Sequence, residues 1–145
     1  MNSYCAYFAR LTLVAIAGGL MSGCATSSVE TAEATPVPPD RILSLEHSTN
    51  RPDRCLVVVK RDTGSSGAQC TARLVVDGKP IADLATGEKI SLYLPLGEHI
   101  ISANPNAGCN GGFSSTSITA VRDQPLTLRI RYGANGEFML RSEAM

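Results

Sequence analysis

Short apolar segments separated by glycine, proline and aspartate recur from Arg54 to Ser142, and this pattern constrains the fold more than any other feature. The segments are rich in β-branched residues or alternate between apolar and polar residues, and none has the 3.6-residue period of a helix. The predicted strands are Arg54–Arg61, Gln69–Asp77, Pro80–Leu84, Ile90–Leu94, His99–Asn104, Phe113–Val121, Leu126–Tyr132 and Glu137–Ser142. Seven or eight short strands joined by Gly-rich turns predict an all-β protein, a small antiparallel β-sandwich. The segment Arg41–His47 is too short to assign.

The chain begins with the pattern of an export signal. Arg10 is the one charged residue before an uncharged apolar run, Leu11–Leu20, which is too short to span a bilayer. The segment Leu20–Cys24 (LMSGC) resembles the lipobox of bacterial lipoproteins. The resemblance implies that residues 1–23 are a signal peptide removed before Cys24, which then carries a diacylglycerol on its sulfur and an acyl chain such as palmitate on its amine. Ordinary export with a free Cys24 is the alternative.

The residue after the cysteine is Ala25. In Gram-negative lipoproteins an aspartate at this place usually marks retention in the inner membrane. For a Gram-negative source, the resemblance therefore implies an outer-membrane anchor with the protein facing the periplasm. Several acyl chains on one cysteine would make this attachment effectively permanent, because each buried methylene contributes about 0.8 kcal/mol.

Residues 24–40 predict a flexible tether between this anchor and the folded domain. Val29 and Val37 are their only larger aliphatic residues, and their charges are three acids and no base. Such a composition buries too little apolar surface to offset the entropy of ordering the chain, and its prolines exclude a helix. We therefore expect the β-sandwich domain to occupy residues 41–145.

Three short motifs give a second resemblance. Val75–Lys79 (VVDGK), Ala85–Glu88 (ATGE) and Leu94–His99 (LPLGEH) resemble PEGA-like β-sandwich modules and small uncharacterised lipoproteins of proteobacterial envelopes. The likeness covers roughly Leu74–Ala103. It implies a sandwich fold and an envelope accessory, since those modules are not catalysts.

The chain has five cysteines, and three are expected to remain in the exported domain. Cys5 leaves with the signal and Cys24 is the lipidation site. In an oxidising envelope one disulfide is expected among the rest. We favour Cys70–Cys109, because each lies where a strand meets a Gly-rich loop that can adapt to disulfide geometry. Pairings with Cys55 remain open, although its apolar neighbours favour a buried free thiol.

The sequence contains no recognisable catalytic or metal-binding constellation, so we expect no enzyme activity, no metal and no cofactor. His47 and His99 are the only histidines, and no metal-ligand spacing exists. We expect His99 to pack in a turn and His47 to be solvated. Asp77 and Asp83 lie at turn-like positions. The 13 basic and 13 acidic residues balance to zero net charge, which argues against nucleic-acid binding through a positive field.

The last predicted hairpin places arginines together on its outer face. A three-residue loop, Ala134–Gly136, sets Ile130 opposite Leu140 and Tyr132 opposite Phe138. The same register sets Arg129 opposite Arg141 and Arg131 opposite Met139. Like charges in facing positions are destabilising, so either an acidic partner compensates them or the face is well solvated. The sharper hypothesis is a patch that meets a phosphate-bearing or acidic envelope component; the same residues would also protect an edge strand.

These inferences predict a lipid-anchored, non-catalytic binding or structural module of the cell envelope that faces the periplasm. One alternative is a periplasmic inhibitor that presents a rigid loop, Asn104–Gly112, with Asn106 as a candidate binding residue, to a hydrolase. The other is a small hydrolase that uses scattered carboxylates. Expected partners are the membrane, through the lipid, and an envelope protein or anionic envelope component.

Overall fold

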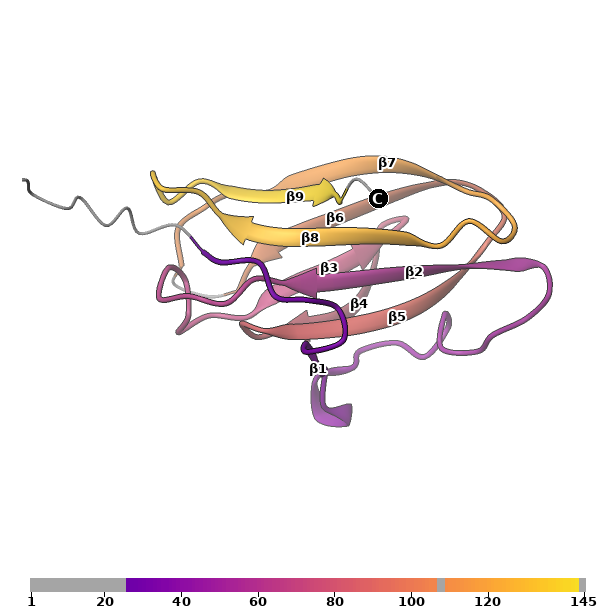
Figure 1. The fold of residues 1–145 in the computed structure, drawn as a ribbon, viewed down its shortest axis with the longest axis horizontal. Coiled ribbons are helices and arrows are strands. Elements are labelled where there is room, and N and C mark those ends of the chain that lie inside the picture. The colour runs from indigo at the N-terminus through magenta and orange to yellow at the C-terminus, as the bar shows by residue number, and fades with distance from the viewer. Residues whose placement is uncertain (1–25, 107–108, 144–145) are drawn as a thin grey trace, which may run out of the picture.

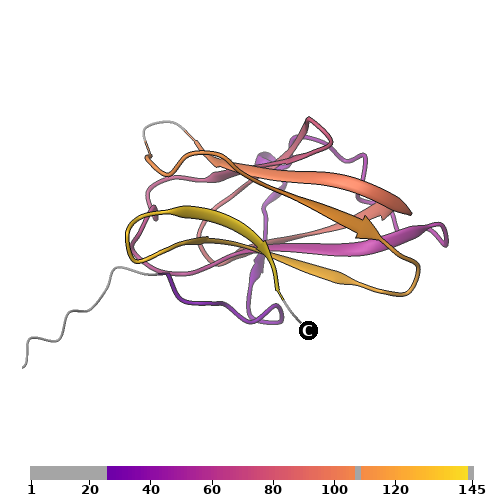
Figure 2. The same cartoon turned by 90° about the horizontal axis from the view of Figure 1, so that it is seen from above.

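Two β-sheets packed face to face make up the part of the chain that the structure, a computed structural model, describes: residues 26–106 and 109–143 (Figures 1 and 2). The first sheet has the order β1 (Thr35–Pro36), β5 (Glu88–Pro95), β2 (Arg54–Arg61), β8 (Leu126–Tyr132) and β9 (Phe138–Ser142). The second has the order β4 (Lys79–Leu84), β3 (Ala72–Val76), β6 (Gly97–Pro105) and β7 (Ser114–Ala120). The predicted all-β sandwich is confirmed.

Helical structure in the described residues is limited to a short 3₁₀ turn, η1 (Pro39–Arg41). None of the helical segments within residues 26–106 and 109–143 has the length and apolar character needed to cross a membrane. The predicted signal peptide 1–23, which includes Cys5, and the predicted lipidation site Cys24 lie outside the described residues.

The core lies between the sheets and is built from alternate residues of each strand. Val57, Val59, Leu74, Ile101 and Leu128 are fully buried there. The alternation predicted for β3 and for the last hairpin places the expected side chains inward, because a strand turns successive side chains to opposite faces. Cys55 is buried and free, as its apolar neighbours predict.

Two strand pairs are parallel, whereas the sequence predicts an antiparallel sandwich. β2 pairs with β8 in parallel, with Val58 facing Thr127, and β1 pairs with β5 in parallel. The chain leaves the first sheet after β5, builds β6 and β7 in the second, and re-enters the first beside β2 (Figure 1). A residue pattern with a period of two sets the buried face of a strand but not its direction.

The predicted tether is wrong for the residues that the structure describes. Residues 26–40 run along the domain and supply β1 at the edge of the five-stranded sheet, and Val29, Ala34 and Val37 are buried. Figure 2 shows this course along the domain. The N–H groups of Thr35 and Val37 donate to the carbonyls of Gly87 and Lys89, at 3.0 and 2.9 Å. The composition argument failed because the segment needs little apolar surface of its own when the sheet supplies the other half of each contact. The folded domain therefore begins before residue 41.

The next residues, Arg41–His47, continue this segment across to the second sheet. Arg41 forms a bidentate ion pair with Glu88, and the N–H of Leu43 donates to the carbonyl of Ile81 at 2.8 Å. The segment from Thr35 to Ser44, here called the strap, thus connects β5 in one sheet with β4 in the other.

His47 is buried, with 8% of its surface exposed, so the prediction that it is solvated is wrong. Its carbonyl accepts the N–H of Tyr93 at 2.8 Å, which fastens the residue to the outer side of β5. Its side chain lines a cavity together with Pro95 and His99.

Candidate functional site

The last hairpin has the register that its loop length predicts. Arg129 faces Arg141, Arg131 faces Met139, and Tyr132 faces Phe138. The outer face of β8 and β9 therefore carries the three arginines of the candidate patch.

The first of these arginines is neutralised within the chain. Arg129 donates from Nε and from its terminal nitrogen to the two oxygens of Asp62, at 2.6 and 2.7 Å. The Asp62 side chain is completely buried. Its hydrogen bond raises the pKa of Arg129, against the opposing effect of burial. This partner was not predicted from the sequence, because the two residues are 67 positions apart in the chain.

Arg131 and Arg141 keep uncompensated charges. Across residues 26–106 and 109–143, no carboxylate lies within ion-pair distance of either guanidinium. A hollow of about 220 Å³ lies beside both, and Glu143, which also lines it, is paired with Lys60 at 2.8 Å. Arg141 is exposed on the edge strand β9. The patch that can receive an anion therefore consists of Arg131 and Arg141.

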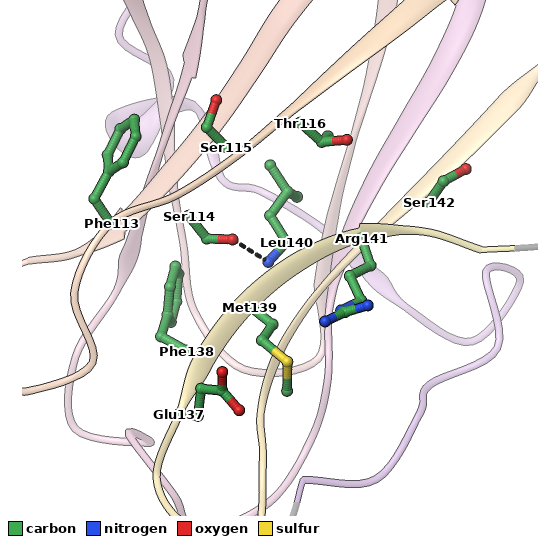
Figure 3. Close-up of a pocket in the computed structure, with 10 residues that line it drawn as sticks. All are labelled: Phe113, Ser114, Ser115, Thr116, Glu137, Phe138, Met139, Leu140, Arg141 and Ser142. Atoms are coloured by element: carbon green, nitrogen blue, oxygen red, sulfur yellow. Dashed lines mark hydrogen bonds between the residues drawn. The ribbon is translucent and has the colours of Figure 1, made fainter.

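A groove of about 590 Å³ runs between β7 and β9, the edge strands of the two sheets (Figure 3). A hydrogen bond joins the strands there, from the N–H of Leu140 to Oγ of Ser114 at 2.9 Å. The Phe113 ring lies at one end and is 69% exposed. Met139 and Arg141 point to the same side of β9, away from Ser115 (Figure 3).

The predicted disulfide is present and holds one side of the segment that the inhibitor hypothesis uses. Cys70 and Cys109 are bonded, with their Cα atoms 6.2 Å apart. Asn106 donates from its backbone N–H and from Nδ2 to the carbonyl and to Oγ1 of Thr71, both at 2.8 Å. Residues 107 and 108 lie outside the described part of the chain.

A buried arginine that the sequence did not single out organises the neighbouring loop. Arg61 is 2% exposed, and its terminal nitrogens donate to the carbonyls of Gly67, Cys70 and Leu84 at 2.6–2.8 Å. Its guanidinium lies 6.0 Å from the centroid of the Tyr132 ring. Desolvation lowers the pKa of Arg61. Arg61 is the last residue of the predicted strand, and no local pattern distinguishes it from a solvated strand end.

The two carboxylates that the hydrolase hypothesis would use are held by basic partners. Asp77 lies 2.7 Å from Nδ1 of His99, and Pro95 O lies 2.7 Å from Nε2 of the same ring. Burial raises the pKa of Asp77, but its hydrogen bonds with His99 and Ile100 outweigh this effect and lower it. His99 thus packs in the turn, as predicted.

The second carboxylate, Asp83, accepts two hydrogen bonds from Arg73 at 2.9 Å, and these lower its pKa. The described residues contain no cluster of three or more His, Cys, Asp or Glu side chains placed to hold a metal ion.

Thr26 fastens the start of the described chain to the end of β8. Its N–H donates to the carbonyl of Tyr132 at 3.2 Å, and its hydroxyl lies 3.1 Å from the Tyr132 nitrogen, which donates to it. The same hydroxyl lies 3.1 Å from the Asp62 carboxylate. Ser27 and Thr63 exchange two backbone hydrogen bonds, at 2.8 and 3.0 Å. We call this set of contacts the clamp.

Compared with known proteins, the chain matches no family, no curated protein and no solved structure. The resemblances to bacterial lipoproteins and to PEGA-like modules therefore stay predictions. The sandwich and the disulfide are established by the structure itself.

Proposed function

We propose that this protein is a lipid-anchored, non-catalytic binding or structural module of the cell envelope, held at the outer membrane on its periplasmic side. The anchor is supported by the resemblance of Leu20–Cys24 to a lipobox. A disulfide between Cys70 and Cys109 is consistent with an oxidising compartment.

The binding role is supported by a difference among the three arginines on the outer face of β8 and β9. Arg129 is paired with a buried carboxylate, whereas Arg131 and Arg141 have no acidic partner in the described chain. Arg131 faces Met139 and Arg141 faces the neutralised Arg129, so Arg131 and Arg141 are diagonal neighbours on this face. An anionic partner would supply the counter-charge that both lack. Arginine binds phosphate and carboxylate groups through two parallel hydrogen bonds, which suits an anionic envelope component.

The test replaces Arg131 and Arg141 together by glutamine and measures what crosslinks to the protein in intact cells. The matched control is Arg122→Gln, since Arg122 is exposed and its guanidinium donates to the carbonyl of Pro52. We expect the double variant to lose the captured component and the control to retain it. Unchanged capture by the double variant would overturn the binding role.

The anchor has its own test, which is metabolic labelling of the protein with an alkyne-bearing fatty acid. We expect the native chain to be labelled and Cys24→Ala to remain unlabelled. Absence of label from the native chain would overturn the lipoprotein assignment.

A second candidate function, inhibition of a hydrolase, is favoured by the way the Asn104–Gly112 loop is held at both sides. Asn106 is bonded to Thr71 on one side and Cys109 to Cys70 on the other, and pre-ordering lowers the entropy cost of binding. Crosslinking from position 106 separates the two functions. A hydrolase captured from position 106 but not from position 131 would support inhibition.

A further inference from the structure

The clamp leaves very little chain between the folded domain and the proposed anchor. Ala25 is the only residue between Cys24 and Thr26. Consecutive Cα atoms are about 3.8 Å apart, so the Cα atom of Cys24 lies within about 8 Å of that of Thr26. A domain anchored through Cys24 is therefore held directly at the membrane surface rather than at the end of a tether.

The clamp also decides which end of the sandwich lies nearest the anchor. Thr26 is bonded to Tyr132, the last residue of β8, and the Tyr132 ring packs edge-on against Phe138 at 5.3 Å. Phe138 shares the groove with Phe113. In Figure 1 the start of the indigo segment lies at the same end of the molecule as the β8–β9 turn. We call the end formed by Thr26, Phe113, Arg131 and the turn Gly133–Glu137 the anchor end.

Side chains at the anchor end have the chemistry of a membrane interface. The Phe113 ring is largely exposed, and an exposed Phe side chain can enter the boundary between lipid headgroups and acyl chains. Arg131, at this end, and Arg141, further along β9, have no acidic partner among the described residues, and a guanidinium can bind phosphate. Glu137, exposed on the adjacent turn, opposes this attraction and leaves a net single positive charge among the three.

We propose that the anchor end sits on the phosphate layer of the membrane that holds Cys24, so that the bilayer itself is the anionic partner of Arg131 and Arg141. The inference rests on the proposed lipid anchor and names the partner that the proposed function leaves open. The clamp supplies the proximity, because the arginine-bearing strand β8 is the strand to which Thr26 is bonded. Phosphate and aromatic contacts then fix the orientation of the domain.

The experiment measures which end of the anchored domain approaches the lipid headgroups. The chain from Cys24 to Met145, which contains every described residue, is coupled through Cys24 to a maleimide lipid in vesicles of phosphatidylethanolamine and phosphatidylglycerol. A fluorophore is placed by click chemistry at Ala134, in the exposed β8–β9 turn, or at Leu96, in the β5–β6 turn. Nitroxide-labelled headgroups then quench the fluorophore that lies closer to them.

We expect strong quenching at position 134 and weak quenching at position 96. Each of Arg131→Gln and Arg141→Gln should lower the ratio of docked to undocked domain by about fivefold, since one arginine near an anionic surface contributes roughly 1 kcal/mol. A flexible Gly/Ser insertion between Ala25 and Thr26 should abolish the difference between the two positions. Equal quenching in the native chain, stronger quenching at position 96, or insensitivity to both substitutions would overturn the proposal.

The quenching experiment tests the docking of the anchor end separately from the lipidation of Cys24, because in the vesicles the lipid is attached to Cys24 chemically. Fatty-acid labelling that fails in cells, together with the expected quenching, would overturn the lipoprotein assignment and leave the surface chemistry intact. Labelled Cys24 without preferential quenching at position 134 would overturn only the docking of the anchor end.

Discussion

On the outer face of the five-stranded sheet, the Arg129 guanidinium donates hydrogen bonds to both carboxylate oxygens of Asp62, at 2.6 and 2.7 Å. The hydroxyl of Thr26 lies 3.1 Å from one of the same oxygens. One fully buried carboxylate thus connects β2, β8 and the start of the described chain.

Replacing Asp62 by asparagine should lower the free energy of unfolding by about 3 kcal/mol, because it leaves the partly buried Arg129 guanidinium without its counter-charge. Urea unfolding followed by circular dichroism measures the loss. Asp53→Asn is the control, since Asp53 is exposed and has no ion pair among the described residues. Equal stability of the two variants would contradict a stabilising role for the pair.

Gly67→Ala should destabilise the protein more than Gly78→Ala does. Both glycines have positive φ, +66° and +80°, so both substitutions incur a similar backbone cost of about 1 kcal/mol. A Cβ at Gly67 would lie 2.6 Å from Cζ of Tyr132, whereas at Gly78 it would meet nothing within 4 Å. Overpacking adds about 1–3 kcal/mol at the first site only. Thermal denaturation of the two variants checks the difference, and matching melting temperatures would refute it.

Removal of the disulfide by Cys70→Ser with Cys109→Ser should lower the free energy of unfolding by about 3–4 kcal/mol, mainly because the unfolded chain gains freedom. The two cysteines are 39 residues apart in sequence. Unfolding of the native chain in the presence of reductant should give the same loss, and Cys55→Ser should respond to reductant as the native chain does. A peptide map without reduction that finds Cys55 in a bridge would contradict the pairing.

The stability of the protein should fall as the pH drops below about 6.5. Burial lowers the pKa of His47, with the nearby Glu46 opposing. The unfolded chain therefore binds this proton more tightly than the folded chain does. The contribution of neutral His47 is complete above the unfolded pKa and is lost as the pH falls through the interval below it. Urea midpoints at pH 7.5 and pH 5.5 measure the change, which should be smaller in His47→Gln. The same slope in both proteins would assign the loss to other groups.

The elements that could be predicted from the sequence are those set by local rules. The loop Ala134–Gly136 fixes the register that places Arg131 opposite Met139, because alternation allows only one buried face. The disulfide was predicted from the adaptable loops beside Cys70 and Cys109.

Contacts between distant segments could not be predicted in this way. The pairing of Arg129 with Asp62 and the carbonyl cradle around Arg61 depend on how the sheets stack, which no local pattern encodes. The packed course of residues 26–40 was missed for a related reason. Its valines look too few when counted alone, but Val29 and Val37 meet a surface that the sheet already provides.

The strap supplies the edge strand β1 of the five-stranded sheet, and this edge limits pairing with a second molecule. Its strand β1 has only two residues, and the second is Pro36, which has no N–H to offer a further strand. A neighbouring molecule therefore finds no continuous ladder of donors and acceptors on that side. Such a blunt edge keeps the sheets of neighbouring molecules from pairing edge to edge and growing into fibrils.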